Sequence, residues 1–599
     1  MTFTTRPTLQ GTFGMVSSTH WMASQSAMRQ LELGGNAFDA AVCAGFVLHV
    51  VEPHLNGPGG EVPAIVTTAG DPAPRVLCGQ GVAPAKATIE YYTSLGLSRI
   101  PGSGPLAAAV PGAVDAWLLL LRDEGTMSLA EVLDPAISYA RNGHPLVARV
   151  ADTVAAVQHL FVEDWPTSAQ TWLRDGRAPT AGSLFRNVAY AETLERLVAE
   201  ADAGGGSRAE RIDRARRAWR EGFVAEAVDR FSTRAIRTGG GEPRQGLVTG
   251  ADLAAWQATW EAPVTLDWQG HTVAKTGPWG QGPALLQTLA TLDAVGDAAL
   301  APSSPEGAHQ VVEALKLAFA DREAWYGDGF DTPLETLLSS EYAAQRAALI
   351  GPEASHELRP GRPDGREPRL PRHVTEEVER LAGAATTGDA TTGEPTVRSD
   401  GETRGDTCHV DVVDRWGNMI SATPSGGWLQ SAPTIPELGF CLGSRMQMFW
   451  LEEGLASSLA PGLRPRTTLT PTLVLRDDGA PVMACGSPGG DQQDQWQLMF
   501  LLRTLAGGMS LQEAIEAPAF HTTSFPGSFW PRAMEPGVVV AESRLGRAVL
   551  DALAARRHKV TVADPWSLGR LCAVARDPET GVVSAGANPR GMQGYAVGR

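Results

Sequence analysis

The sequence predicts an α+β protein in which helices cover antiparallel sheet. Two observations support this fold class. The first half of the chain alternates helical and extended segments, and several of its helices end at glycine. The region after Thr407 is rich in strand pairs joined by turn sequences. Helices on both sides of such hairpins imply a helix-covered sheet, and 599 residues can build one large layered domain or two to four smaller ones.

Five segments of the first half have helical patterns. Residues 21–36, 112–125 and 129–144 have helical spacing and are closed by glycine. Residues 208–222 are rich in interleaved acids and bases, which indicates a solvated surface helix. Residues 307–328 are predicted to form a long amphipathic helix with its charges on the outer face.

A change of composition divides the chain into three parts. Residues 352–406 are rich in Gly, Pro, Thr and charge, which predicts a polar, mobile linker between a large body, 1–351, and a C-terminal part, 407–599. In the C-terminal part, residues 409–423 predict a hairpin that turns around 415–418. Residues 467–490 and 568–591 repeat the pattern of strand, turn and strand.

Composition excludes several classes of function. The net charge is −17, and no basic block interleaves with aromatic residues, so nucleic acid is not an expected partner. The six cysteines are scattered without a CxxC pair, which predicts neither a disulfide framework nor a metal site. No apolar run reaches ~18 residues, so no membrane span is expected. The first residues lack the apolar stretch of a signal peptide, and we therefore expect a cytoplasmic protein.

The stretch RSDGETRGDTCHVDVVD, residues 398–414, changes from polar to strand-like at Thr407. If the bond between Asp406 and Thr407 is cut, the hydroxyl of Thr407 acquires its own α-amine as a neighbour. An α-amine has a pKa of about 7.7–8.0, so it can act as a general base near neutrality. One residue would then supply both nucleophile and base. Taken alone, a threonine at this place is an ordinary strand start.

An acyl-transfer site also needs donors for the oxyanion. Gly489 and Gly490 follow a predicted strand, and successive glycines let backbone N–H groups approach a substrate closely. In isolation the pair is also compatible with an ordinary glycine-rich turn.

Motifs along nearly the whole chain resemble the γ-glutamyltransferase family of N-terminal nucleophile hydrolases. They include LGGNAFDAAVCAGFVLHVVEPH, LNGPGGEVPAIV, AVPGAVDAWLLLLRDEG, GDTCHVDVVDRWGNMISAT and LVLRDDGAPVMACGSPGG, in the family's order. The resemblance implies a four-layer αββα sandwich and no cofactor. It also implies a precursor that cleaves itself before a threonine. The resulting large and small subunits would stay together as a heterodimer or as a dimer of heterodimers.

The same resemblance assigns roles to individual residues. It implies that Thr407 is the nucleophile, that the processing site is Asp406–Thr407, and that Ser425 supports the nucleophile. Gly489 and Gly490 would form the oxyanion hole. Thr467 and Thr468 match paired serines of the family that contact a substrate carboxylate.

The sequence departs from family members that act on glutathione where they bind the glutamyl head group. Ile89 stands in place of an arginine that pairs with the α-carboxylate. Arg445 and Met448 replace a glutamine and the aspartate that holds the α-amine, and Gly427 replaces an asparagine. Burying a charged head group without partners costs several kcal/mol. Such a site should therefore reject γ-glutamyl groups.

We therefore expect an amidohydrolase or acyltransferase whose small-molecule substrate is an amide with an acyl group that lacks the α-amine, such as an oxamate-like or glutaryl-like half-amide. Arg445 would add positive charge near the pocket, or else be a surface or structural residue. A second hypothesis keeps γ-glutamyl hydrolase and transpeptidase activity. A third is an unprocessed, non-catalytic binding protein. His409 shares a strand face with Thr407 and is interpreted as structural, and Cys408 as a small buried residue.

Overall fold

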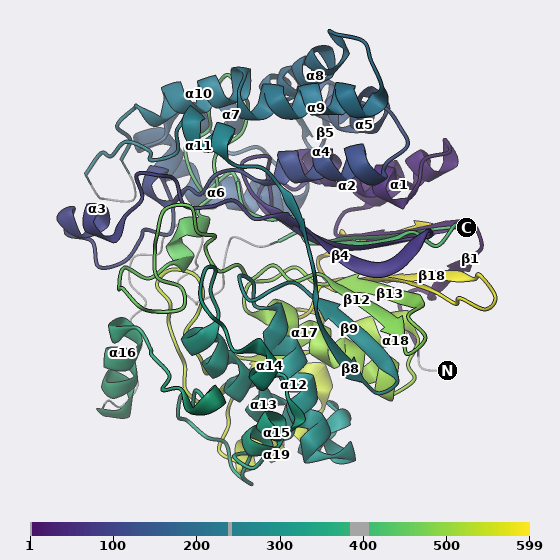
Figure 1. Ribbon diagram of the computed structural model, residues 1–599, viewed down its shortest axis with the longest axis vertical. Helices are drawn as coiled ribbons and strands as arrows, with labels where there is room; N and C mark the ends of the chain where they lie inside the picture. The colour runs from purple at the N-terminus through teal and green to yellow at the C-terminus, as the bar shows by residue number, and fades with distance from the viewer. Residues whose placement is uncertain (1–2, 238–241, 384–406) are drawn as a thin grey trace.

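The computed structural model describes residues 3–237, 242–383 and 407–599 (Figure 1). Asp406, the first residue of the predicted processing site, lies outside the described residues. No helix within the described ranges is both long and apolar enough to cross a membrane.

Two sheets of seven strands each form the centre of the molecule. The first has the order β19 (Tyr595–Gly598), β2 (Gly14–Ser18), β10 (Val410–Asp414), β11 (Met419–Ala422), β3 (Val62–Thr68), β4 (Asp71–Gly79) and β7 (Thr259–Glu261). The second has the order β1 (Leu9–Gly11), β18 (Val583–Ala587), β17 (Cys572–Arg576), β13 (Pro481–Gly486), β12 (Thr472–Arg476), β9 (His271–Lys275) and β8 (Val264–Trp268). All neighbouring strands in both sheets run antiparallel.

Helices cover the outer face of each sheet, above and below the strands in Figure 1. Over the first sheet lie α1 (Trp21–Glu32), α2 (Ala37–Val51) and α4 (Ala113–Glu124), with α5 (Leu129–Asn142), α8 (Val188–Asp202) and α9 (Arg208–Arg220) outside them. Against the second sheet lie α12 (Gly282–Val295), α17 (Gln492–Leu501) and α18 (Leu511–Glu516), backed by α13 (Pro305–Trp325) and α19 (Arg547–Ala555). This arrangement confirms the expected four-layer αββα sandwich.

The inner faces of the two sheets pack against each other. Val413 and Met419 of the first sheet share a buried apolar cluster with Leu473 and Val574 of the second. Both sheets combine strands from before and after residue 407. In the first sheet the β10–β11 hairpin lies between β2 and β3, and in the second sheet four strands from after residue 407 lie between β1 and β9. The three predicted hairpins are confirmed, with β10–β11, β12–β13 and β17–β18 as their strands.

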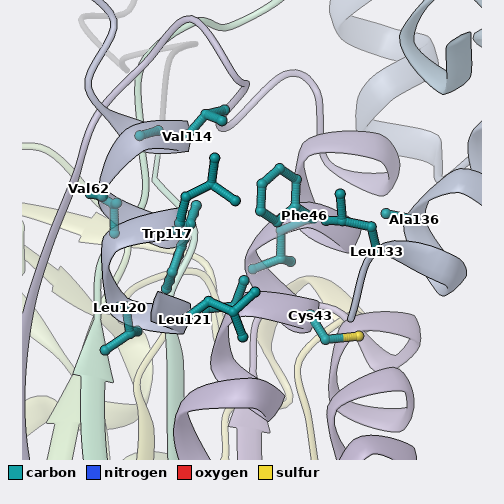
Figure 2. Close-up of a cluster of buried hydrophobic side chains, with 14 of the residues drawn as sticks. Cys43, Phe46, Val62, Val114, Trp117, Leu120, Leu121, Leu133 and Ala136 are labelled. Atoms are coloured by element: carbon teal, nitrogen blue, oxygen red, sulfur yellow. The ribbon is translucent and has the colours of Figure 1, made fainter. Parts of the chain in front are cut away.

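The largest apolar core lies between the first sheet and its helices. Phe46 of α2 packs beside Trp117 and Leu121 of α4 and Leu133 of α5 (Figure 2). A Cβ at Gly45 would lie 2.5 Å from the Trp117 ring, so the absence of a side chain there lets α2 and α4 approach closely.

The prediction that α13 carries its charges on an outer face is wrong. This helix lies between other elements, and five of its six charged residues are buried: Glu313, Lys316, Asp321, Arg322 and Glu323. They are paired with residues from distant segments: Arg322 with Asp491, and Glu323 with Arg466 at 2.9 Å. Paired charges can be buried, because each neutralises the other in a site without water.

The predicted linker is also folded over much of its length. Of residues 352–406, the structure describes 352–383, which end in the helix α16 (Arg372–Gly383). Val374 of this helix is buried against Trp450 and Leu455. Residues 352–383 are thus packed on the protein despite their polar composition. The folded body therefore extends at least thirty residues beyond the predicted boundary at 351.

Candidate active site

Thr407 lies three residues before the first residue of β10, at the end of the central hairpin of the first sheet. It forms an isolated antiparallel bridge with Ser425, which follows β11. The amide of Cys408 donates to the carbonyl oxygen of Pro424 at 3.0 Å. Thr407 is only 3% exposed. The hairpin thus brings the predicted nucleophile and the predicted supporting hydroxyl side by side.

Two side chains hold the Thr407 hydroxyl. It donates a hydrogen bond to Ser425 Oγ at 3.2 Å, and it accepts one from Nε2 of Gln493 at 3.3 Å. Gln493 lies in the first turn of α17 and is fully buried. Gln493 is not among the residues predicted from the sequence, although it stands three residues after the glycine pair.

Gly489 and Gly490 form the loop between β13 and α17. Gly489 has φ +120°, a conformation that L residues with side chains rarely adopt. A Cβ at Gly490 would lie 2.8 Å from the Phe529 ring. Within the described residues, neither backbone N–H donates a hydrogen bond to the protein, so both can donate to an oxyanion. Gln493 also donates to the carbonyl of Gly489, which ties this loop to Thr407.

Gly427, predicted to line the substrate site, packs backbone to backbone with residues 57–60. Its φ is +60°, and a Cβ there would lie 2.7 Å from the Gly60 nitrogen. A Cβ at Gly60 would lie 2.1 Å from the Ser425 carbonyl oxygen. The NGPGG stretch, residues 56–60, therefore sets the position of the strand end that carries Ser425.

Arg445 is buried and paired with Glu61. Its Nε donates to a Glu61 carboxylate oxygen at 2.6 Å, and the backbone of Glu61 pairs with that of Ser425. Burial raises the pKa of the Glu61 carboxyl, and the charge of Arg445 opposes that shift. The positive charge of Arg445 is thus balanced by Glu61, and burial excludes the alternative of a surface residue. Glu61 is not among the residues predicted from the sequence.

Met448 lies in a small apolar cluster with Trp428 and Phe529. The guanidinium carbon of Arg445 lies 5.9 Å from the ring centroid of Trp428 and 5.8 Å from that of Phe529. Nη1 of Arg445 is buried without a hydrogen-bond partner in the described part of the chain. A Cβ at Gly490 would also touch the Phe529 ring. Phe529 is therefore a neighbour of both Arg445 and the oxyanion loop.

The other predicted binding residues divide between two places. The backbone of Thr467 pairs with Trp279 and Gln281, and Gln281 Nε2 lies 3.5 Å from the Gly490 carbonyl oxygen. Thr468 is buried, and its hydroxyl has no partner among the described residues. Ile89 begins α3 (Ile89–Ser94) and packs against an apolar cluster separate from that of Met448.

The side chains of His409 and Cys408 contact other buried residues of the fold. His409 is fully buried, and its ring nitrogens lie 3.0 Å from Thr423 Oγ1 and 2.8 Å from Asp411 Oδ1. Cys408 Sγ donates to Glu52 at 3.1 Å, and burial raises the pKa of this thiol well above its ordinary value. These contacts support the structural interpretation of both residues.

His309, Glu313 and His558 form the one group in the described ranges with the spacing of metal ligands. The two imidazoles are hydrogen-bonded to each other at 2.8 Å. Glu313 pairs with Lys316 and Arg359, so two cations already neutralise it. We assign no metal to this group. All six cysteines lie in the described ranges, are buried and form no disulfide.

Known proteins resemble this chain over nearly its whole length. The family description of gamma-glutamyltranspeptidase matches residues 23–598. The glutathione hydrolase-like YwrD proenzyme of Bacillus subtilis is 32% identical, and the match covers 98% of this chain and 99% of the relative. The oxamate amidohydrolase proenzyme of Klebsiella pneumoniae is 31% identical over 98% of each chain. The relatives also include acylase proenzymes of Pseudomonas.

A solved structure, LmbA2991HD, is 58% identical, covers 100% of both chains and superposes with a TM-score of 0.92. The fold is therefore that of an N-terminal nucleophile hydrolase, and the relatives are named as proenzymes. The chain belongs to the gamma-glutamyltranspeptidase family.

Proposed function

We propose that this chain is a self-processing amidohydrolase that uses Thr407 as its nucleophile and acts on an acyl group without an α-amine. The observation that carries the proposal is the position of the Thr407 hydroxyl. It lies between Ser425 and Gln493, at the start of a strand and beside a glycine loop with unengaged N–H groups in the described part of the chain. This constellation can attack a carbonyl and stabilise the resulting oxyanion.

The first reaction is cleavage of the chain itself. Oγ1 of Thr407 attacks the carbonyl carbon of Asp406, the C–N bond breaks, and the peptide nitrogen takes up a proton to become the α-amine of Thr407. Water then hydrolyses the ester between Asp406 and Thr407. Since each of the two sheets contains hydrogen-bonded strands from both fragments, the fragments remain together as a heterodimer.

The second reaction uses the new terminus. The α-amine takes the proton of Oγ1, Oγ1 attacks the substrate carbonyl, and the N–H groups of Gly489 and Gly490 stabilise the oxyanion. The C–N bond breaks as the leaving nitrogen accepts the proton from the α-ammonium. Water, activated by the α-amine, then attacks the acyl ester and releases the acid, and Oγ1 recovers its proton.

Substrate choice follows from the residues around Arg445. A free amino acid head group would need an acid for its ammonium, and Met448 supplies none. Nη1 of Arg445 and the hydroxyl of Thr468 are buried groups that can donate to a carboxylate. We therefore propose a dicarboxylic half-amide of oxamate or glutaryl type. The named activity of the Klebsiella relative, oxamate amidohydrolase, supports this class.

Hydrolysis of γ-glutamyl amides is the second candidate, since one relative is named glutathione hydrolase-like. The test is a panel of anilides with the same leaving group: oxalyl, glutaryl and γ-glutamyl anilide, each given to processed protein. Our proposal predicts a kcat/KM at least tenfold higher for an acyl group without the α-amine. A higher kcat/KM for the γ-glutamyl anilide would favour the second candidate.

A further inference from the structure

Gln493 is placed to act on the substrate as well as on the nucleophile. It is the second residue of α17, and its side chain is fully buried. Nε2 donates both to Thr407 Oγ1, at 3.3 Å, and to the carbonyl oxygen of Gly489. Because a carbonyl oxygen only accepts hydrogen bonds, the contact with Gly489 sets which end of the amide faces the nucleophile.

The other end of this amide has no partner. Oε1 of Gln493 is buried and accepts no hydrogen bond from the described residues. Buried acceptors are nearly always satisfied in folded proteins, so an unsatisfied one indicates a missing donor. Oε1 is bonded to the same carbon as Nε2, and it therefore lies next to the atom that touches Oγ1. The atoms that approach this position during the reaction are those attached to the attacked carbonyl.

We propose that Gln493 is a catalytic residue that binds both Thr407 Oγ1 and the N–H of the scissile amide. Nε2 holds Oγ1 toward the glycine loop. Oε1 accepts the hydrogen bond of the scissile N–H, which orients the bond to be broken. This proposal rests on the proposed amide hydrolysis and narrows its substrate class to primary and secondary amides. Tertiary amides and esters lack the required donor.

Gln493 also contributes to release of the acyl group. When the tetrahedral intermediate formed by water collapses, the bond between the acyl carbon and Oγ1 breaks, and the electron pair stays on Oγ1. Nε2 donates a hydrogen bond to that oxygen while the α-ammonium returns the proton to it. Hydrogen bonds to a developing negative charge are stronger than those to a neutral hydroxyl.

The test compares Gln493→Met and Gln493→Glu with a matched control on the same helix, Gln495→Met. Gln495 is equally buried, and its amide bonds only Asp491 and Thr522 among the described residues. The substrates are oxalic acid monoanilide, its N-methyl analogue and the phenyl ester. Fragment formation at Thr407 and the melting temperature are measured on the same samples.

We expect Gln493→Met to lower kcat for the anilide by 10- to 100-fold and to abolish most of the preference for anilide over N-methylanilide. Gln493→Glu, which keeps an acceptor and loses the donor, should retain more of that preference. Gln495→Met should change stability and not the preference. The proposal is overturned if both methionine variants change kcat alike, or if the preference survives in Gln493→Met. Failure of the proposed function would differ, because wild type itself would then form no fragment or would cleave no anilide.

Discussion

Thr407 donates its hydroxyl hydrogen to Ser425 across 3.2 Å, and the two residues form an isolated antiparallel β-bridge. The position of the nucleophile is thus set by the hairpin of β10 and β11 rather than by a flexible loop. Residues 56–60 pack against the backbone at Ser425, so the N-terminal part of the chain also contributes to this position.

Removing the Ser425 hydroxyl should weaken catalysis and leave the fold intact. Ser425→Ala deletes the acceptor of the Thr407 hydroxyl, and one such hydrogen bond is worth about 1 kcal/mol, which is roughly five- to tenfold in rate. We expect slower fragment formation and a lower kcat by at least that factor. Ser421→Ala is the control, because Ser421 lies on the same strand pair and bonds Cys485 and His409 instead. Equal kinetic effects of the two substitutions would contradict the assignment.

A side chain on the oxyanion loop should be far more damaging. In Gly490→Ala the new Cβ would lie 2.8 Å from the Phe529 ring, so the loop must shift. Loss of one oxyanion donor costs about 10²–10³-fold in kcat. The comparison is Gly479→Ala, which alters a glycine with φ +82° in a turn without close neighbours. That control should lower the melting temperature slightly and leave kcat unchanged. If Gly490→Ala kept the wild-type kcat, the Gly490 N–H would not stabilise the oxyanion.

Substitutions at Arg445 and Glu61 can distinguish a role of Arg445 in stability from a role in substrate binding. Arg445→Met leaves the Glu61 carboxylate buried and unpaired, which should cost about 3–5 kcal/mol in the free energy of unfolding. The double variant Arg445→Met with Glu61→Gln removes both charges and should recover most of that loss. Both variants should show a raised KM for oxalyl and glutaryl anilides. If the stable double variant kept the wild-type KM, Arg445 would be a structural residue only.

Acid should destabilise the protein through its buried histidines. Burial lowers the pKa of five histidines from 6.5 to about 3 or about 4: His20, His49, His144, His521 and His558. The unfolded chain therefore binds more protons than the folded chain below pH ~6.5. Their stabilising contribution is complete above that pH and is lost as the pH falls toward the folded values.

Each such histidine contributes up to ~1.4 kcal/mol per pH unit to the slope of the free energy of unfolding against pH. We expect urea denaturation midpoints to fall steeply from pH 7 to pH 5. His558→Gln removes one titrating imidazole and should reduce this pH dependence by the contribution of about one proton. The Gln amide can still donate to His309, so the local contact is kept. His159→Gln, on an exposed side chain, should leave it unchanged. A midpoint that does not vary over this range would mean that the buried imidazoles do not control acid stability.

The sequence predicted local structure well where turn chemistry is explicit. The Arg415–Asn418 and Asp477–Gly479 turns join the strands that their neighbours predict. It failed for α13 because a charged helix looks the same whether its partners are water or distant residues. Arg322 and Asp491 are far apart in the chain, and no local sequence pattern indicates that they pair. Residues 352–383 misled the prediction for the same reason, since their few apolar side chains pack on Trp450.

Prediction of the site had a similar limit. Thr407, Ser425 and the glycine pair could be located from motifs, and the structure brings them into one place. Glu61 and Gln493 could not, because each acts through a contact between elements that are remote in sequence. For Gln493 a signal did exist: QQDQ, residues 492–495, places polar side chains in a helix start that directly follows the glycine loop.

The most direct test is intact mass and N-terminal sequencing of wild type beside Thr407→Ala and Thr407→Ser. We expect wild type to yield a 193-residue fragment, residues 407–599, that begins at Thr407. Thr407→Ser should cleave more slowly at the same bond, and Thr407→Ala should remain one chain. If wild type remains uncleaved, the α-amine never forms and the chain is a binding protein of this family. If Thr407→Ala is cleaved at the same bond, another group performs the chemistry.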